Sequence, residues 1–274
     1  MTISVIIVSY NVRYFLAQCL CAVQTAMQGI NGEIIVVDNA STDGTATHLP
    51  PLFPTIKWIL QNENAGFAKA NNKGLTAAAG NFILFLNPDT LIPEHFFKEI
   101  LAFVNRHPNC GAIGVKMIDG AGYFLPESKR AFPTPVAALF KLCRLADIFP
   151  KSAVFNQYAL GHLSENEIHC VPVLSGACMF VSHQVLDTTG GFDEQFFMYG
   201  EDLDLCYRFQ KSGYKVFYVH STQIIHYKGE STKRSSIDET KIFYNAMDLF
   251  VKKHLSTSFI VEIILRSAVL LRKI

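Results

Sequence analysis

The 274-residue chain lacks several features that would assign it to a common class of protein. Its seven cysteines form no C-x-x-C pair, which argues against a structural zinc site and a disulfide framework, so we expect reduced thiols. Its 24 Lys and Arg residues nearly balance 23 Asp and Glu residues, and the formal net charge of +1 gives no basic footprint for nucleic acid. No uninterrupted apolar run reaches about 18 residues, so we predict no membrane-spanning helix.

Three motifs of well-known enzyme classes are also missing. No G-x-G-x-x-G follows the first predicted strand, no G-x-x-x-x-G-K-[ST] occurs, and G-x-S-x-G is absent. These absences argue against a Rossmann cofactor site, a P-loop and an α/β-hydrolase. The first ten residues, MTISVIIVSY, lack the basic region of a signal peptide and indicate a buried strand instead.

Short apolar runs alternate with helical patterns in the first part of the chain. Strands are predicted at residues 3–9, 33–38, 56–60, 81–87 and 111–117, and helices at 14–28, 66–80 and 94–107. The strands are apolar throughout rather than alternating, which is typical of strands covered on both faces. The pattern predicts an α/β domain built of βαβ units around a mostly parallel sheet, whose ligands gather at the carboxyl ends of the strands.

The pattern is looser after residue 120. Residues 132–152 form a Pro-bounded apolar helix candidate, residues 178–193 read as strand, helix and Gly-Gly turn, and residues 215–221 indicate another strand. The tail from 237 to 274 is helical in two pieces, with a break around 256–258. Because no internal repeat or interdomain linker interrupts the chain, we expect one large domain with a helical tail.

Polar residues follow four successive strands of the predicted sheet. They are Asp38, Asn64, Asn71 and Asp89, and the topology would bring them to one rim. Each residue taken singly could be a helix cap or a turn residue. Their joint position at the predicted ligand edge favours a binding site.

A cluster of acids stands in the stretch FMYGEDLDLCYR, where Glu201, Asp202 and Asp204 fall within four residues. Acidic side chains are common in the first turn of a helix, where free N–H groups and the helix dipole stabilise them. Asp204 and Arg208 are also spaced for an i,i+4 ion pair. On local grounds the cluster is therefore either a helix start or a catalytic site.

Six separated motifs resemble those of the family 2 glycosyltransferases, in the family's order. They are VSYN, VVDNASTDGT, NAGFAKANNKG, FLNPDT, GGFDEQFFMYGEDLDLCYR and HYKGES. The resemblance covers roughly residues 3 to 232 and is strongest to the rhamnosyltransferase-type branch. It implies a GT-A fold over residues 1–236, with a nucleotide-binding half (1–118) and an acceptor-binding half (119–236), followed by the helical tail (237–274).

The resemblance also implies roles for single residues at the donor site. Ser9 and Tyr10 would flank the nucleoside, and Asp38 would bind its pyrimidine or ribose. The loop and helix that border the nucleotide would contribute Asn64, Gly66 and Asn71.

For the reaction itself, the resemblance implies a carboxylate base and a divalent metal, Mn²⁺ or Mg²⁺. Asp202 matches the catalytic acid of the family's E-D motif and Glu201 a supporting acid. Asp89 matches the last acid of the metal motif, whose first acid is replaced here by Asn87. His226 either completes the metal shell or is a half-buried histidine at a strand end.

The implied activity is inverting transfer of a sugar from a nucleotide sugar, a dTDP- or UDP-sugar, to a lipid-linked glycan or polysaccharide. The branch suggests L-rhamnose from dTDP-rhamnose. A sugar nucleotidyltransferase and a non-catalytic carbohydrate-binding protein are the rivals. No Q-x-x-R-W follows the E-D motif, which disfavours a processive synthase.

The location of the protein is expected to be the cytoplasm, at the inner face of the cell membrane. The mean hydropathy of +0.22 is high, and residues 257–274 form an amphipathic pattern too charged to span a bilayer. The apolar, basic segment 136–149 could add a second contact. The alternative is that the tail packs on the domain or on a second subunit as a homodimer.

Overall fold

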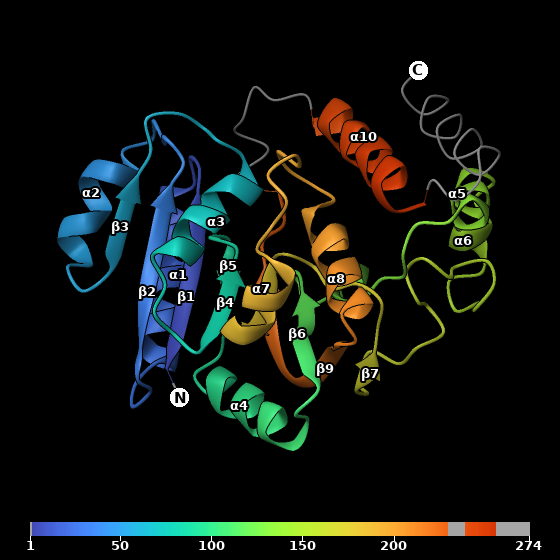
Figure 1. Ribbon diagram of the computed structural model, residues 1–274, viewed down its shortest axis with the longest axis horizontal. Helices are drawn as coiled ribbons and strands as arrows, with labels where there is room; N and C mark the ends of the chain where they lie inside the picture. Colours follow the sequence, from blue (N-terminus) through green and yellow to red (C-terminus); the bar gives the residue numbers. More distant parts are fainter. Residues whose placement is uncertain (1, 230–238, 256–274) are drawn as a thin grey trace.

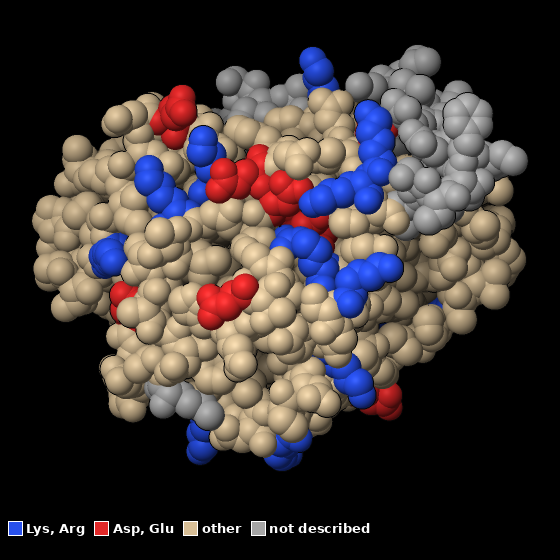
Figure 2. Space-filling view, viewed as in Figure 1, with Lys and Arg blue, Asp and Glu red and all other residues tan. Residues whose placement is uncertain are grey.

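The computed structural model describes residues 2–229 and 239–255, which form a central nine-stranded sheet with helices on both faces (Figure 1). The sheet order is β3-β2-β1-β4-β8-β6-β9-β5, and β7 pairs with β9. The α/β class is therefore confirmed, whereas the arrangement of strands is mixed rather than mostly parallel. In the view of Figure 2 acidic and basic side chains lie next to one another, in keeping with the near-zero net charge.

The first half of the chain forms the parallel part of the sheet. Its elements, in chain order, are β1 (Ile3–Ser9), α1 (Arg13–Ala26), β2 (Gly32–Asp38), α2 (Thr45–Leu52), β3 (Lys57–Leu60), α3 (Phe67–Thr76) and β4 (Phe82–Leu86). Strand β1 pairs in parallel with β2 and β4, so that Ser9 stands opposite Asp38 at the carboxyl end. All seven residues of β1 are buried, as its unbroken apolar sequence predicts.

The second half contains the antiparallel pairs. Its strands are β5 (Thr90–Leu91), β6 (Cys110–Ile118), β7 (His169–Cys170), β8 (Cys178–Ser182) and β9 (Lys215–His226). Its helices are α4 (Phe96–Arg106), η1 (Pro126–Ser128), α5 (Pro135–Leu142), α6 (Leu145–Ile148), α7 (His183–Thr189), α8 (Glu201–Lys211), α10 (Glu239–Phe250) and the π-helical turn η2 (Val251–Leu255). Strand β8 lies between β4 and β6 and runs antiparallel to both, while β6 and β9 are parallel.

Alternate residues of β1 supply two apolar layers. Val5 and Ile7 pack with α1, α2 and α4 on one face, whereas Ile6 packs with α7, α8 and α10 on the other. Helix α3 covers the second face beside β1 and β2. The carboxyl ends of β1, β2 and β4 are thereby left to face a cavity between the two halves of the chain.

Some predicted elements differ from those observed. The helix expected over 132–152 is split into α5 and α6, because Arg144 adopts a left-handed conformation (φ 60°) that interrupts the helix. Strand β9 continues beyond residue 221 to His226, where it pairs with β5. In the helical tail, α10 matches the first predicted piece, and residues 257–274 lie outside the described residues. None of the described helices is both long and apolar enough to cross a bilayer.

Candidate active site

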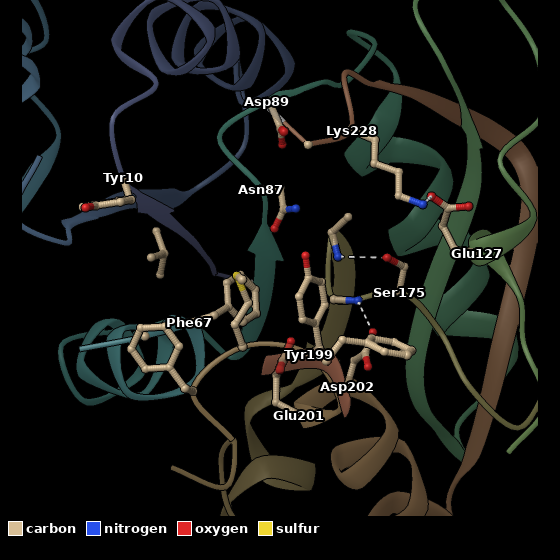
Figure 3. Close-up of a pocket in the computed structure, with 18 of the residues that line it drawn as sticks. Tyr10, Phe67, Asn87, Asp89, Glu127, Ser175, Tyr199, Glu201, Asp202 and Lys228 are labelled. Carbon is tan, nitrogen blue, oxygen red and sulfur yellow. Dashed lines mark hydrogen bonds and ion pairs between the residues drawn. The ribbon is translucent and has the colours of Figure 1, made fainter. Parts of the chain in front are cut away.

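A cavity of about 670 Å³ opens at the carboxyl ends of β1 and β4, and α10 and the segment before α8 also line it. Seven of the predicted site residues line it: Tyr10, Asn64, Gly66, Asp89, Glu201, Asp202 and His226. Figure 3 shows Asn87 and Asp89 on one side of the cavity and Tyr199, Glu201 and Asp202 on the other. Three predicted residues, Ser9, Asp38 and Asn71, are not part of the lining.

Ser9 and Asp38 are buried next to each other at the ends of β1 and β2. Asp38 Oδ2 accepts a hydrogen bond from the backbone N–H of Ser41 at 3.1 Å, while Asp38 Oδ1 and Ser9 Oγ have no partner among the described residues. Burial raises the pKa of Asp38, against the opposing effect of the hydrogen bonds from Ser41. Buried polar atoms without a partner are costly, and a ligand that supplied hydrogen bonds here would relieve that cost.

Asn39 organises the loop that enters α3, a role that the sequence analysis did not assign to it. Its Nδ2 donates to Asn64 Oδ1 at 2.7 Å, and its Oδ1 accepts from Gln61 Nε2 at 2.7 Å and from the backbone N–H of Ala65 at 3.0 Å. Because it directly follows Asp38 in the VVDN motif, its position in the sequence could have revealed it. Asn39 lines the cavity and fixes Asn64 there.

Gly66 brings the loop that enters α3 against the segment before α8. Its φ is +85°, and a Cβ at this position would lie 2.4 Å from the carbonyl oxygen of Phe197. The N–H of Phe67 donates to that same oxygen at 2.7 Å. Only glycine fits such a close approach, so Gly66 has a structural reason to be present. Asn71, by contrast, donates to Phe67 O within its own helix and is buried.

Asp89 and His226 face each other across the β5–β9 pair. His226 Nε2 lies 3.4 Å from Asp89 Oδ1 and 3.4 Å from Asn87 Nδ2. Both side chains are buried, and Asp89 Oδ1 has no hydrogen-bond partner within the described part of the chain. Nearby, Lys228 Nζ forms a 2.7 Å ion pair with Glu127 Oε1 at the cavity wall.

Asp202 is held in place from two directions. Its Oδ2 accepts hydrogen bonds from Arg130 Nη2 at 2.5 Å and from the backbone N–H of Gly176 at 3.1 Å. Although burial would lower the pKa of Arg130, the charge of Asp202 raises it, so that the guanidinium stays protonated. Arg130 lines the cavity, yet it lies in a loop with no recognised motif, and the sequence analysis missed it.

Glu201, beside Asp202, has a different environment. Burial, and then the charge of Asp202, raise the pKa of Glu201 to about 8, and its Oε2 is buried without a partner among the described residues. Tyr199 and Gly200, just before it, have φ values of 70° and 79°. A tyrosine in this left-handed region is strained, and such strain clusters at functional sites. The raised pKa of Glu201 favours its protonated form, beside the hydrogen-bonded side chain of Asp202.

Asp204 is the structural member of the acidic cluster. It is fully buried, and its carboxylate accepts hydrogen bonds at 2.7 Å from Arg208 Nε, Lys253 Nζ and His254 Nε2. Burial would raise the pKa of Asp204, but these hydrogen bonds and the charge of Arg208 lower it below its usual range. The expected i,i+4 pair with Arg208 is present. The additional contacts fix the end of the C-terminal helix onto α8.

Helix α10 contributes Thr240, Phe243 and Tyr244 to the cavity. The sequence predicted a helix here, but no motif in it indicates that the helix packs beside the cavity.

Comparisons with known proteins show the family of the chain. A family model described as Glycosyl transferase family 2 matches residues 4–164, more than half of the chain. The N-acetylglucosaminyl-diphospho-decaprenol L-rhamnosyltransferase of Mycobacterium tuberculosis is 28% identical over 229 residues, which cover 80% of this chain and 74% of the relative. Rhamnosyltransferase WbbL of Escherichia coli is 27% identical over 168 residues, 61% of this chain and 59% of the relative.

Solved structures support the same fold. The mannosyltransferase PcManGT from Pyrobaculum calidifontis, in complex with GDP-Man and Mn²⁺, matches with a TM-score of 0.60 at 18% identity, over 97% of this chain and 68% of that one. This likeness shows that the chain has the GT-A fold.

Proposed function

Because the chain belongs to glycosyl transferase family 2 and is a glycosyltransferase of its rhamnosyltransferase-like branch, we propose that it transfers L-rhamnose from dTDP-L-rhamnose with inversion at the anomeric carbon. The acceptor would be a lipid-linked glycan that ends in N-acetylglucosamine, by analogy with the mycobacterial relative. One observation carries this proposal: a carboxylate, Asp202, is fixed at a cavity whose opposite side is suited to a nucleotide diphosphate.

Asp202 is the proposed general base. The hydrogen bonds from Arg130 and Gly176 orient its carboxylate, which would take the proton of an acceptor hydroxyl. Glu201, with its pKa raised to about 8, is protonated at neutral pH and can donate a hydrogen bond to an acceptor oxygen. The two acids would thus orient the acceptor and deprotonate it.

Asp89 and His226 are the proposed ligands of a divalent metal. The residues fit such an ion, because Asp89 Oδ1 lacks a hydrogen-bond partner among the described residues and His226 Nε2 lies 3.4 Å from it. Within residues 2–229 and 239–255 no three His, Cys, Asp or Glu side chains form a complete metal site, so oxygens of the diphosphate and water would supply the other ligands. A bound cation would neutralise negative charge on the leaving diphosphate. A histidine ligand favours Mn²⁺ over Mg²⁺.

The nucleotide would lie toward β1 and β2. Tyr10, Asn39 and Asn64 line the cavity there, and Ser9 and Asp38 offer unpartnered polar atoms behind them. A sugar nucleotidyltransferase is disfavoured by the family match, and a non-catalytic carbohydrate-binding protein has no need of a fixed carboxylate beside a protonated one.

The donor is tested by measuring release of the nucleoside diphosphate from dTDP-L-rhamnose, UDP-N-acetylglucosamine and GDP-mannose, with and without an N-acetylglucosamine-terminated diphospholipid. We expect dTDP-L-rhamnose to be used with the highest kcat/KM, and the lipid to accelerate its turnover because transfer replaces hydrolysis. Preference for another donor would reject rhamnose while keeping glycosyl transfer. No turnover of any nucleotide sugar would reject the proposed function.

We also propose contact with the inner face of the cell membrane. Five large apolar side chains of α5, α6 and the following residue are 45–63% exposed, namely Val136, Leu139, Leu142, Ile148 and Phe149. Lys141 and Arg144 lie among them, and such a basic, apolar surface suits anionic lipid. The protein should sediment with anionic vesicles, and Leu139→Glu should weaken this, whereas Leu52→Glu, at an exposed leucine of α2, should not. Equal binding by all three proteins would contradict the contact.

A further inference from the structure

Three aromatic side chains that line the cavity contact one another beside the segment that carries the acid pair. They are Tyr199, Phe243 and Tyr244. The ring centroids of Tyr199 and Phe243 are 5.8 Å apart at 73°, and those of Phe243 and Tyr244 are 5.7 Å apart at 73°. Phe243 remains 42% exposed although it is one wall of the cavity. An apolar ring face is therefore available to a ligand next to the carboxyl pair.

The helix that carries Phe243 and Tyr244 is anchored at two places. Helix α10 packs in the same core cluster as α8 (Figure 1), and the buried carboxylate of Asp204 accepts hydrogen bonds from Lys253 and His254 of η2, which directly follows α10. Ala246 of α10 packs against Gly200, since a Cβ added to Gly200 would lie 3.4 Å from the Cβ of Ala246. Because these contacts fix the helix, little conformational entropy of its backbone is lost when a ligand binds to Phe243. A smaller loss of entropy on binding gives a higher affinity.

The combination of aromatic rings and carboxyl groups indicates which class of ligand would bind here. A pyranose ring has an apolar C–H face and a polar hydroxyl edge, so an aromatic ring can cover the face while carboxyl groups bind the edge. Tyr199 lies two residues before Glu201 and three before Asp202, and its left-handed backbone directs its ring to this part of the cavity. The ring of Tyr199 and the proposed base, Asp202, are therefore carried by the same segment of the chain.

We propose that Phe243 of α10, with Tyr199, forms a platform for the sugar ring of a glycan acceptor and presents one of its hydroxyl groups to Asp202. The assignment rests on the proposed function, since it takes Asp202 as the base. It makes the C-terminal helix part of acceptor recognition. The donor would be bound by the opposite side of the cavity.

Fluorescence tests the platform without a turnover assay. The chain has a single tryptophan, Trp58, on the edge strand β3, so a Trp58→Phe protein is a suitable background. In this background Phe243→Trp should give a saturable blue shift of emission with methyl N-acetyl-glucosaminide, because the sugar ring covers the indole. Tyr123→Trp, at a tyrosine that is 73% exposed and does not line the cavity, should not respond.

Kinetics supply the second test. Phe243→Ala should raise the acceptor KM by about tenfold, the order expected for loss of an aromatic contact, and should change the donor KM by less than about twofold. Phe243→Tyr should restore the acceptor KM to within about twofold, since it keeps the ring. Tyr123→Ala should leave both constants as they are.

Each contrary result has a distinct meaning. If Phe243→Ala raises the donor KM and leaves the acceptor KM unchanged, the platform is overturned while glycosyl transfer stays intact. The same holds if decanol, a simple apolar alcohol, causes the blue shift and the glycoside does not. A blue shift with the glycoside in a protein that turns over no nucleotide sugar would support the platform and reject the proposed function.

Discussion

Asp202→Asn is expected to lower kcat by roughly 10²–10⁴-fold, the usual contribution of a general base. The amide keeps the shape of the side chain and can still contact Gly176 and Arg130 through its oxygen, but it cannot accept the proton of the acceptor hydroxyl. Donor binding should persist, because the proposed nucleotide side of the cavity is formed by other residues. Steady-state kinetics, together with calorimetric titration of the nucleotide, would measure the two effects separately.

Asp204→Asn is the matched control, because this acid lies on the same helix and its partners are Arg208, Lys253 and His254 rather than cavity residues. It should reduce the free energy of unfolding, since it weakens a buried charge cluster. Its kcat, measured at a temperature where the protein is folded, should fall far less. Equal losses of kcat in the two variants would show that Asp202 is not the base.

Metal removal should have the other large effect. Activity is expected to disappear in EDTA and to return on addition of Mn²⁺ or Mg²⁺, because the cation would stabilise the leaving diphosphate. Asp89→Ala should weaken the joint binding of Mn²⁺ and nucleoside diphosphate, which calorimetry can follow without turnover. The physical reason is that Asp89 Oδ1 is the buried oxygen that faces His226 and has no hydrogen-bond partner among the described residues.

Glu94→Ala serves as the control for this experiment, since Glu94 is an exposed acid five residues further along the chain and does not line the cavity. It should bind Mn²⁺ and nucleotide as the unaltered protein does. Full activity in the chelator would remove the metal from the mechanism. If His226→Ala leaves the metal requirement unchanged, His226 is a structural residue at the end of β9.

The parallel half of the fold was predictable because its signals are local. The apolar run of β1 ends at Ser9 and that of β2 at Asp38, and these predicted ends are the observed ones. Parallel neighbours bring such ends to one edge without any further information. The position of Asp89 at the cavity followed from the same rule, whereas that of Asp202 followed from a motif.

The mixed half was not predictable in this way. Strand β8 pairs with β4 across about ninety residues of chain, and a short apolar run carries no record of its partner or direction. The contact of Arg130 with Asp202 joins residues 72 positions apart, and Lys253 reaches Asp204 over 49 positions. These side chains are ordinary in sequence, and only the tertiary packing gives them their roles.

The position of β8 has a consequence for how the protein is made. Strand β4 ends at Leu86, but the strand that covers its free edge begins only at Cys178. During synthesis the parallel half would therefore emerge with an open, apolar edge until β8 is translated, and such edges invite pairing with other chains. Closing the sheet requires a long-range contact, which slows folding. The order of the strands thus makes the nascent chain most vulnerable to aggregation between the completion of β4 and the arrival of β8.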